Sequence, residues 1–78
     1  MDKYFDSSII VDEENLPKIL KEYIEELKRY AEEDNDISYA LCFENFDAAI
    51  KGFVLNNKVS ENDYKLLIRK YGGIYWWI

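Results

Sequence analysis

Residues 12–33 read DEENLPKILKEYIEELKRYAEE, and this stretch decides the fold class. Its apolar residues recur at spacings of three, four and one, which is the pattern of a single stripe along an α-helix. They are Leu16, Leu20, Tyr23, Ile24, Leu27, Tyr30 and Ala31. Asp12 is a good N-cap, the acids at 13 and 14 suit the positive end of the helix dipole, and a proline is tolerated in a first turn. We therefore expect a helix over residues 12–33.

The next stretch, ISYALCF at residues 37–43, fits two patterns. Large apolar residues alternate with small ones, as in a strand, but an apolar stripe at helical spacing also begins here and continues to residue 54. That stripe contains Tyr39, Phe43, Phe46, Ile50, Phe53 and Val54. The helical interpretation explains more residues with one element and leaves no lone strand in need of a partner. It predicts a helix over about 37–56.

A third helix is predicted over about 60–71. Ser60 and Asp63 have the spacing of a capping box, an apolar stripe follows, and Gly72 takes the position where many helices end. The β-prone segments SSIIV (7–11) and IYWWI (74–78) would form a short two-stranded element if the termini meet. The expected fold is mainly α, a compact three-helix domain spanning residues 1–78 with extended N- and C-terminal segments.

The small size of the chain limits what it can do. Its 78 residues allow one core, to which two Trp, seven Tyr and four Phe contribute large buried areas. The chain has no His, Thr or Gln, so the usual general base and its partners are missing, and Cys42 is expected to be a small buried hydrophobe. We expect no enzyme, no cofactor and no metal site.

The charge is unevenly distributed along the chain. Residues 1–36 carry twelve acids against five bases, a net −7, whereas residues 37–78 carry four against five, a net +1. Such a field repels nucleic acid and anionic lipid and favours a basic protein partner. The start of the chain lacks the basic and long apolar regions of a secretory signal, and no stretch approaches the length of a membrane span. A cytoplasmic setting is expected.

Two features are candidate partner-binding sites. The first is an acidic surface on and after the first helix; its alternative interpretation is a merely solvated face. It consists of Glu22, Glu25, Glu26, Glu32, Glu33, Asp34 and Asp36. The second is the tail at residues 72–78, which either folds back over the helices or presents Tyr75, Trp76 and Trp77 to a partner.

These observations favour a small non-enzymatic protein-binding module that masks a basic surface of a partner. An inhibitor, an immunity-like protein or an anti-defence protein would act in this way, because spaced carboxylates can replace the phosphates of nucleic acid. Phage and mobile-element proteins that block host defence share this general character, but the analogy is one of size and charge and not of fold. The alternative is a self-associating structural or adaptor subunit, a homodimer formed through the aromatic tail or an apolar helix face.

Overall fold

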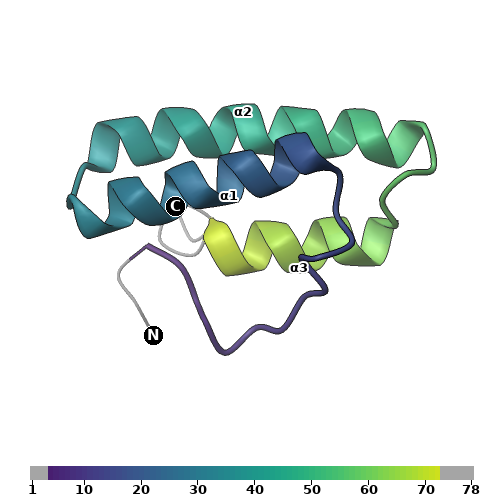
Figure 1. Ribbon diagram of the computed structural model, residues 1–78, viewed down its shortest axis with the longest axis horizontal. Coiled ribbons are helices and arrows are strands. Elements are labelled where there is room, and N and C mark those ends of the chain that lie inside the picture. The colour runs from purple at the N-terminus through teal and green to yellow at the C-terminus, as the bar shows by residue number, and fades with distance from the viewer. Residues whose placement is uncertain (1–3, 73–78) are drawn as a thin grey trace.

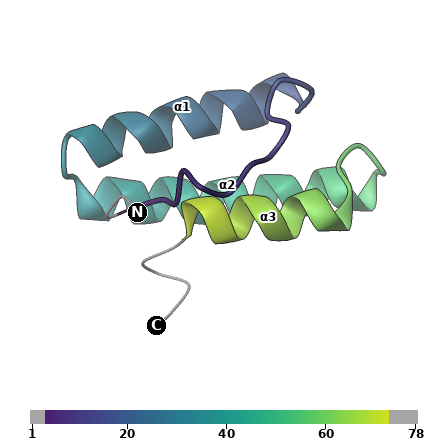
Figure 2. The ribbon, with the colours of Figure 1, turned by 90° about the horizontal axis from the view of Figure 1, so that it is seen from below.

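The computed structural model describes residues 4–72, and this part of the chain contains three helices and no strand. They are α1 (Lys18–Glu32), α2 (Asp36–Leu55) and α3 (Glu61–Tyr71). In Figure 1, α1 and α3 both lie on the lower side of α2, and Figure 2 shows α1 offset from the other two. The prediction of a mainly helical chain is confirmed.

The first helix begins later than its sequence pattern indicates, so the expected start at Asp12 is wrong. α1 starts at Lys18, with Pro17 as its N-cap and no side chain capping its free amides. A proline disfavours helical geometry in the residue before it, so a helix that included Leu16 would be strained there. Asp12 instead accepts a hydrogen bond from the Asn15 side chain (2.6 Å). Leu16 is nevertheless buried, in the loop before α1.

Both ends of α2 are defined by the local chemistry of asparagine and aspartate. Residues 37–43 are helical, which confirms that interpretation of ISYALCF. The Asn35 side chain accepts from the amide of Ser38 (3.1 Å) and caps the helix. Before it, Asp34 has a left-handed φ of 54°, and after α2 Asn57 has a φ of 59°. In both places the chain makes the paired backbone hydrogen bonds of a Schellman motif, which ends α1 and α2.

The third helix has the predicted cap at its start and a different reason for glycine at its end. Ser60 accepts from the amide of Asp63 (3.1 Å). Gly72 has a φ of −96°, which any residue can adopt, so left-handed geometry does not require glycine there. A Cβ at Gly72 would, however, lie 2.5 Å from the Phe43 ring and 2.7 Å from the Ile68 carbonyl oxygen. Close packing against α2 therefore requires glycine at this position.

The core is aromatic, as the composition indicates. Tyr39, Phe46 and Tyr71 are fully buried, and the rings of Phe46 and Tyr71 meet edge to face with centroids 5.9 Å apart. The Tyr39 hydroxyl lies 2.7 Å from the carbonyl oxygen of Tyr71 and 3.3 Å from that of Tyr4. A hydroxyl buried this deeply needs such acceptors, and here they tie α2 to the end of α3 and to the N-terminal segment.

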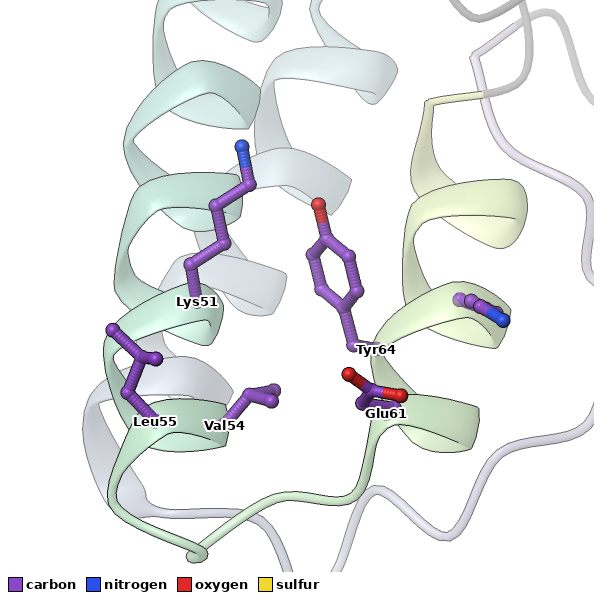
Figure 3. Close-up of a pocket in the computed structure, with 6 residues that line it drawn as sticks. Lys51, Val54, Leu55, Glu61 and Tyr64 are labelled. Carbon is purple, nitrogen blue, oxygen red and sulfur yellow. The ribbon is translucent and has the colours of Figure 1, made fainter.

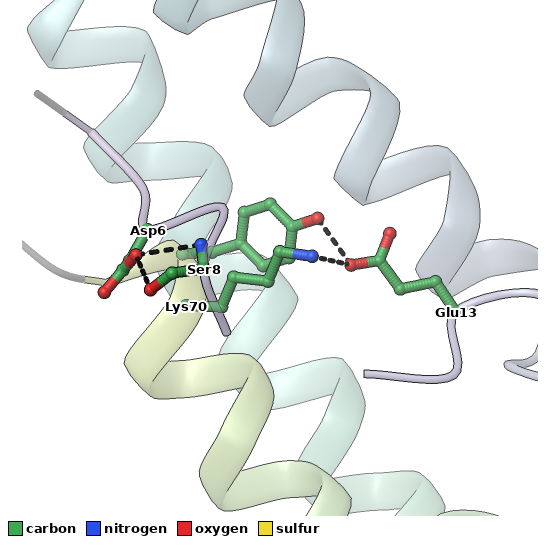
Figure 4. A network of polar contacts seen from close by, with 5 residues as sticks. Asp6, Ser8, Glu13 and Lys70 are labelled. Carbon is green, nitrogen blue, oxygen red and sulfur yellow. Dashed lines mark hydrogen bonds and ion pairs between the residues drawn. The ribbon is translucent and has the colours of Figure 1, made fainter. Parts of the chain in front are cut away.

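The segment before α1 packs across α3. The amide of Asp6 donates to the carbonyl of Lys70 (2.8 Å), and the Asp6 carboxylate accepts from the amide and hydroxyl of Ser8 (Figure 4). Glu13 accepts from the Lys70 ammonium (2.8 Å) and the Tyr71 hydroxyl (2.7 Å). Burial alone would raise the pKa of Glu13, but these two hydrogen bonds and the positive charges of Lys70 and Lys28 together lower it.

Residues 7–11, one half of the expected two-stranded element, form a turn and irregular structure. The other half, residues 74–78, lies outside the described residues, so the pairing stays a prediction. None of the helices in residues 4–72 combines the length and apolar character that a membrane span needs.

Candidate protein-binding site

The five glutamates predicted to form one acidic surface on the first helix are all exposed, but they divide into two flanks of α1. The helix buries Leu20, Ile24 and Leu27 against the rest of the molecule. With about 3.6 residues per turn, residues 22, 26 and 33 lie on one side of the outward face and residues 25 and 32 on the other. Both flanks carry bases at helical spacing: Lys18 and Arg29 accompany Glu22, Glu26 and Glu33, and Lys21 and Lys28 accompany Glu25 and Glu32.

The flank that carries Glu25 and Glu32 is neutralised by lysines. Lys21 precedes Glu25 by four residues, and Lys28 precedes Glu32 by four, so acids and bases alternate along the helix surface. Exposed pairs of this kind contribute little stability and leave little net field. This flank resembles an ordinary solvated helix face.

The flank that carries Glu22 and Glu26 forms a shallow depression. Ile19, Glu22, Tyr23 and Glu26 line it, at spacings of three and four that bring them onto one helix face. Ile19 is 47% exposed, and Tyr23 is half-buried beside it. The α1 depression, as we call this group, thus combines two carboxylates with the side chains of Ile19 and Tyr23, and most of its lining is polar.

Cys42 of α2 lies beside the α1 depression. Its thiol is 3.7 Å from the Glu26 carboxylate and 3.8 Å from the carbonyl oxygen of Tyr23. Burial raises the pKa of the Cys42 thiol to about 11, and the nearby negative charge of Glu26 adds to the shift. A thiol with this pKa stays protonated near neutral pH, so Cys42 is a poor nucleophile.

The remaining two predicted acids, Asp34 and Asp36, lie in the α1–α2 connection and at the start of α2. Both accept a hydrogen bond from the hydroxyl of Tyr4, with a distance of 2.8 Å to Asp34. The hydrogen bond to Asp36 raises the pKa of Tyr4, and burial and Asp34 raise it further. These carboxylates therefore anchor the N-terminal segment, a role that the sequence did not predict because Tyr4 is remote along the chain.

The structure also contains a groove between α2 and α3 that the sequence analysis missed. Lys51, Val54 and Leu55 line it from α2, and Glu61, Tyr64 and Lys65 line it from α3 (Figure 3). The Tyr64 hydroxyl donates to Asp47 (2.7 Å), which also pairs with Lys51 (3.1 Å). Burial raises the pKa of Tyr64, and the hydrogen bond to Asp47 adds to the shift. The groove is mainly apolar with lysines at its edge, and it depends on the spacing between two helices rather than on any sequence motif.

The predicted aromatic site, Tyr75, Trp76 and Trp77, lies outside the described residues. Within residues 4–72, no group of three or more His, Cys, Asp or Glu side chains is arranged to hold a metal ion. Comparison of the chain with protein-family models, with curated proteins and with solved structures gave no match.

Proposed function

We propose that this chain is a small non-enzymatic binding module that masks a basic surface of a partner protein, in the manner of an inhibitor, immunity-like or anti-defence protein. The observation that supports this function best is the α1 depression, where Glu22 and Glu26 lie beside the partly exposed side chains of Ile19 and Tyr23. The solvated-face interpretation accounts for the flank with Glu25 and Glu32, whereas on the other flank Ile19 and Tyr23 lie beside the acids.

A lysine or arginine side chain of a partner matches the α1 depression chemically. Such a side chain has an apolar stem and a charged end, so the stem would lie on Ile19 and Tyr23 while the charge meets the carboxylates. The Tyr23 ring adds a cation–π attraction for a charge above its face. A neutral or acidic side chain would gain none of the electrostatic part of this binding energy.

The wider charge distribution supports the same class of partner. Residues 1–36 carry a net −7, which lies before and after α1 because the four acids and four bases of α1 itself balance, and Glu33 follows Glu26 on the same flank. This field attracts a basic surface and speeds its association, and it repels nucleic acid. A partner that normally binds nucleic acid would lose access to its own cationic groove while this module occupies it.

The proposed function is tested with two charge-matched double variants. The first, Glu22→Gln with Glu26→Gln, removes two charges from the α1 depression; the second, Glu25→Gln with Glu32→Gln, removes two from the opposite flank. A partner retained from source-cell lysate at low salt and released by raised salt is identified, purified and titrated against each variant by calorimetry.

We expect the first variant to weaken binding by about tenfold or more, which is roughly 1.4 kcal/mol, and the second to weaken it much less. Equal losses in both variants would mean that only the total charge matters and that the α1 depression is not a site. A partner whose contact surface is acidic or uncharged would contradict the masking function itself.

The alternative function, self-association through the aromatic tail, depends on residues 73–78 and stays a prediction, as does the cytoplasmic setting. Light scattering on the purified chain and on a Trp76→Ser, Trp77→Ser variant tests that alternative, because it requires a mass above one chain that the variant loses.

A further inference from the structure

The outer face of α2 is more apolar than an exposed helix face should be. Of the large hydrophobic residues that residues 4–72 leave exposed, three lie on α2: Ile37 is 76% exposed, Leu41 57% and Leu55 84%. The opposite side of the helix buries Tyr39, Cys42, Phe46 and Ile50. A helix that is apolar all round is normally covered on every side, yet α1 and α3 both lie on one side of this one (Figure 1).

Ile37 has no counterpart toward the end of α2, but the other two exposed residues are placed symmetrically about Ala48. Leu41 and Leu55 each lie seven residues from it, one on either side, so the three residues recur at the heptad spacing of a helix–helix seam. Glu44 lies four residues before Ala48, and Lys51 lies three residues after it. The sequence of this face therefore reads similarly in both directions, except that the acid on one side of the centre is replaced by a base on the other.

This symmetry is what a two-fold contact between identical helices requires, because such a contact presents the same surface from both partners. When two copies of α2 run antiparallel and cross at Ala48, Leu41 of each copy meets Leu55 of the other. Glu44 and Lys51 lie on the same flank of the seam, so each Glu44 then faces the partner's Lys51. Ala48 is small, and Gly52, four residues later, has no side chain and is exposed, with no atom within 4 Å of the place where its Cβ would lie, so the two backbones can approach closely near the crossing point.

We propose that the outer face of α2 is a self-association surface, on which a second copy of this chain packs its own α2 antiparallel with Leu41, Ala48 and Leu55 in the seam. Lys51 can pair with Glu44 of the second copy without losing its present ion pair with Asp47. Its side chain is 60% exposed and lies 3.1 Å from Asp47, and an ammonium group has donors for a second carboxylate.

The contact is limited to one face of one helix. From Leu41 to Leu55 the seam is about 21 Å long at 1.5 Å per residue. One helix face of this length buries less surface than the roughly 1,600 Å² of a standard stable interface. The dimer is therefore expected to dissociate on dilution. It would leave both copies of the α1 depression outside the seam, so the inference does not depend on the proposed function and can fail separately from it.

A cysteine at the symmetry centre provides a direct test. The two copies of residue 48 meet at the axis, so Ala48→Cys is expected to form an intermolecular disulfide under mild oxidation. Asn62→Cys, at an exposed position of α3 away from the seam, is the control and is expected to remain a single chain. The native Cys42 is buried and remains in both variants.

Two further variants test the seam and its direction by sedimentation over a concentration series. The full chain should show a mass that rises from one chain toward two. Leu55→Lys should raise the dissociation constant by about tenfold or more, since it removes apolar contact twice per dimer. Because Leu55 is so exposed, helix content by circular dichroism should not change.

Glu44→Lys and Lys51→Glu should each weaken the dimer, and the double variant should restore it, because only the antiparallel arrangement pairs these two positions. A single-chain mass at all concentrations would overturn the proposal. So would a dimer that Leu55→Lys leaves unchanged, or equal crosslinking through Ala48→Cys and Asn62→Cys.

Discussion

Substituting the glycine at the end of α3 should destabilise the protein although its backbone angles are ordinary. In Gly72→Ala the new Cβ would lie 2.5 Å from Phe43 Cζ and 2.7 Å from the Ile68 carbonyl oxygen. That oxygen already accepts the Gly72 amide at 2.8 Å, so it cannot move away without losing the bond that ends the helix. The ring must therefore shift, and overpacking of this kind costs about 1–3 kcal/mol.

Gly52→Ala is the matched control for this substitution. Gly52 lies inside α2, and a Cβ there would meet no atom within 4 Å. Alanine is more favourable than glycine in a helix interior by about 0.5–1 kcal/mol, so this variant should be more stable than the parent chain. Glycine-to-alanine substitution is thus expected to lower the free energy of unfolding at position 72 and to raise it at position 52.

Thermal and urea unfolding followed by circular dichroism measure both variants at one low protein concentration. For a domain of this size, 1 kcal/mol corresponds to about 4–8 °C in Tm. Gly72→Ala should therefore lower Tm by about 4 °C or more, and Gly52→Ala should raise it by about 2–8 °C. A neutral or stabilising Gly72→Ala would refute the close approach of α3 to Phe43.

Three other predictions concern stability. Tyr39→Phe removes the hydroxyl hydrogen-bonded to Tyr71 and should cost about 1–3 kcal/mol in urea unfolding; no loss would contradict the buried bond. Asn57→Gly relieves a left-handed residue with φ of 59° and should add up to about 1 kcal/mol in urea unfolding; a loss of stability would contradict a cost for asparagine there. Burial and Glu13 raise the pKa of Tyr71, and the hydrogen bond to Asp36 raises that of Tyr4. As the pH rises, these tyrosines therefore lose their protons in the unfolded chain before they do so in the folded chain, and the free energy of unfolding should fall above about pH 10. In a base titration, phenolate absorbance of these tyrosines should therefore appear together with loss of helix, and their ionisation in a chain that stays helical would contradict the assignment.

Much of the fold was predictable because its signals are local. The stripe of Leu20, Ile24 and Leu27 and the Ser60 cap each depend on residues a few positions apart, and both appear in the structure as expected. The start of α1 was missed because two local signals compete there. Asp12 is a good cap by type, but Pro17 opposes helical geometry at Leu16, and the structure follows the proline.

The candidate site was predictable only in part. Exposure of Glu22 and Glu26 follows from the helical period once the buried stripe is known. Their separation from Glu25 follows from the same period, but the sequence analysis treated all of these acids as a single surface. The binding of Tyr4 to Asp34 joins residues thirty positions apart, and no local pattern indicates such a contact.

The sequence by itself determined that this chain forms three helices, that Ser60 caps the third and that acid is concentrated in its first half. Periodicity, capping and charge depend on neighbouring residues, so they exist before the chain folds. Only the tertiary structure decided that Asp34 and Asp36 bind Tyr4, that Gly72 must be small and that one apolar face of α2 is left uncovered by α1 and α3. These properties depend on which elements pack together, because a side chain's surroundings are set by residues that only folding brings near it.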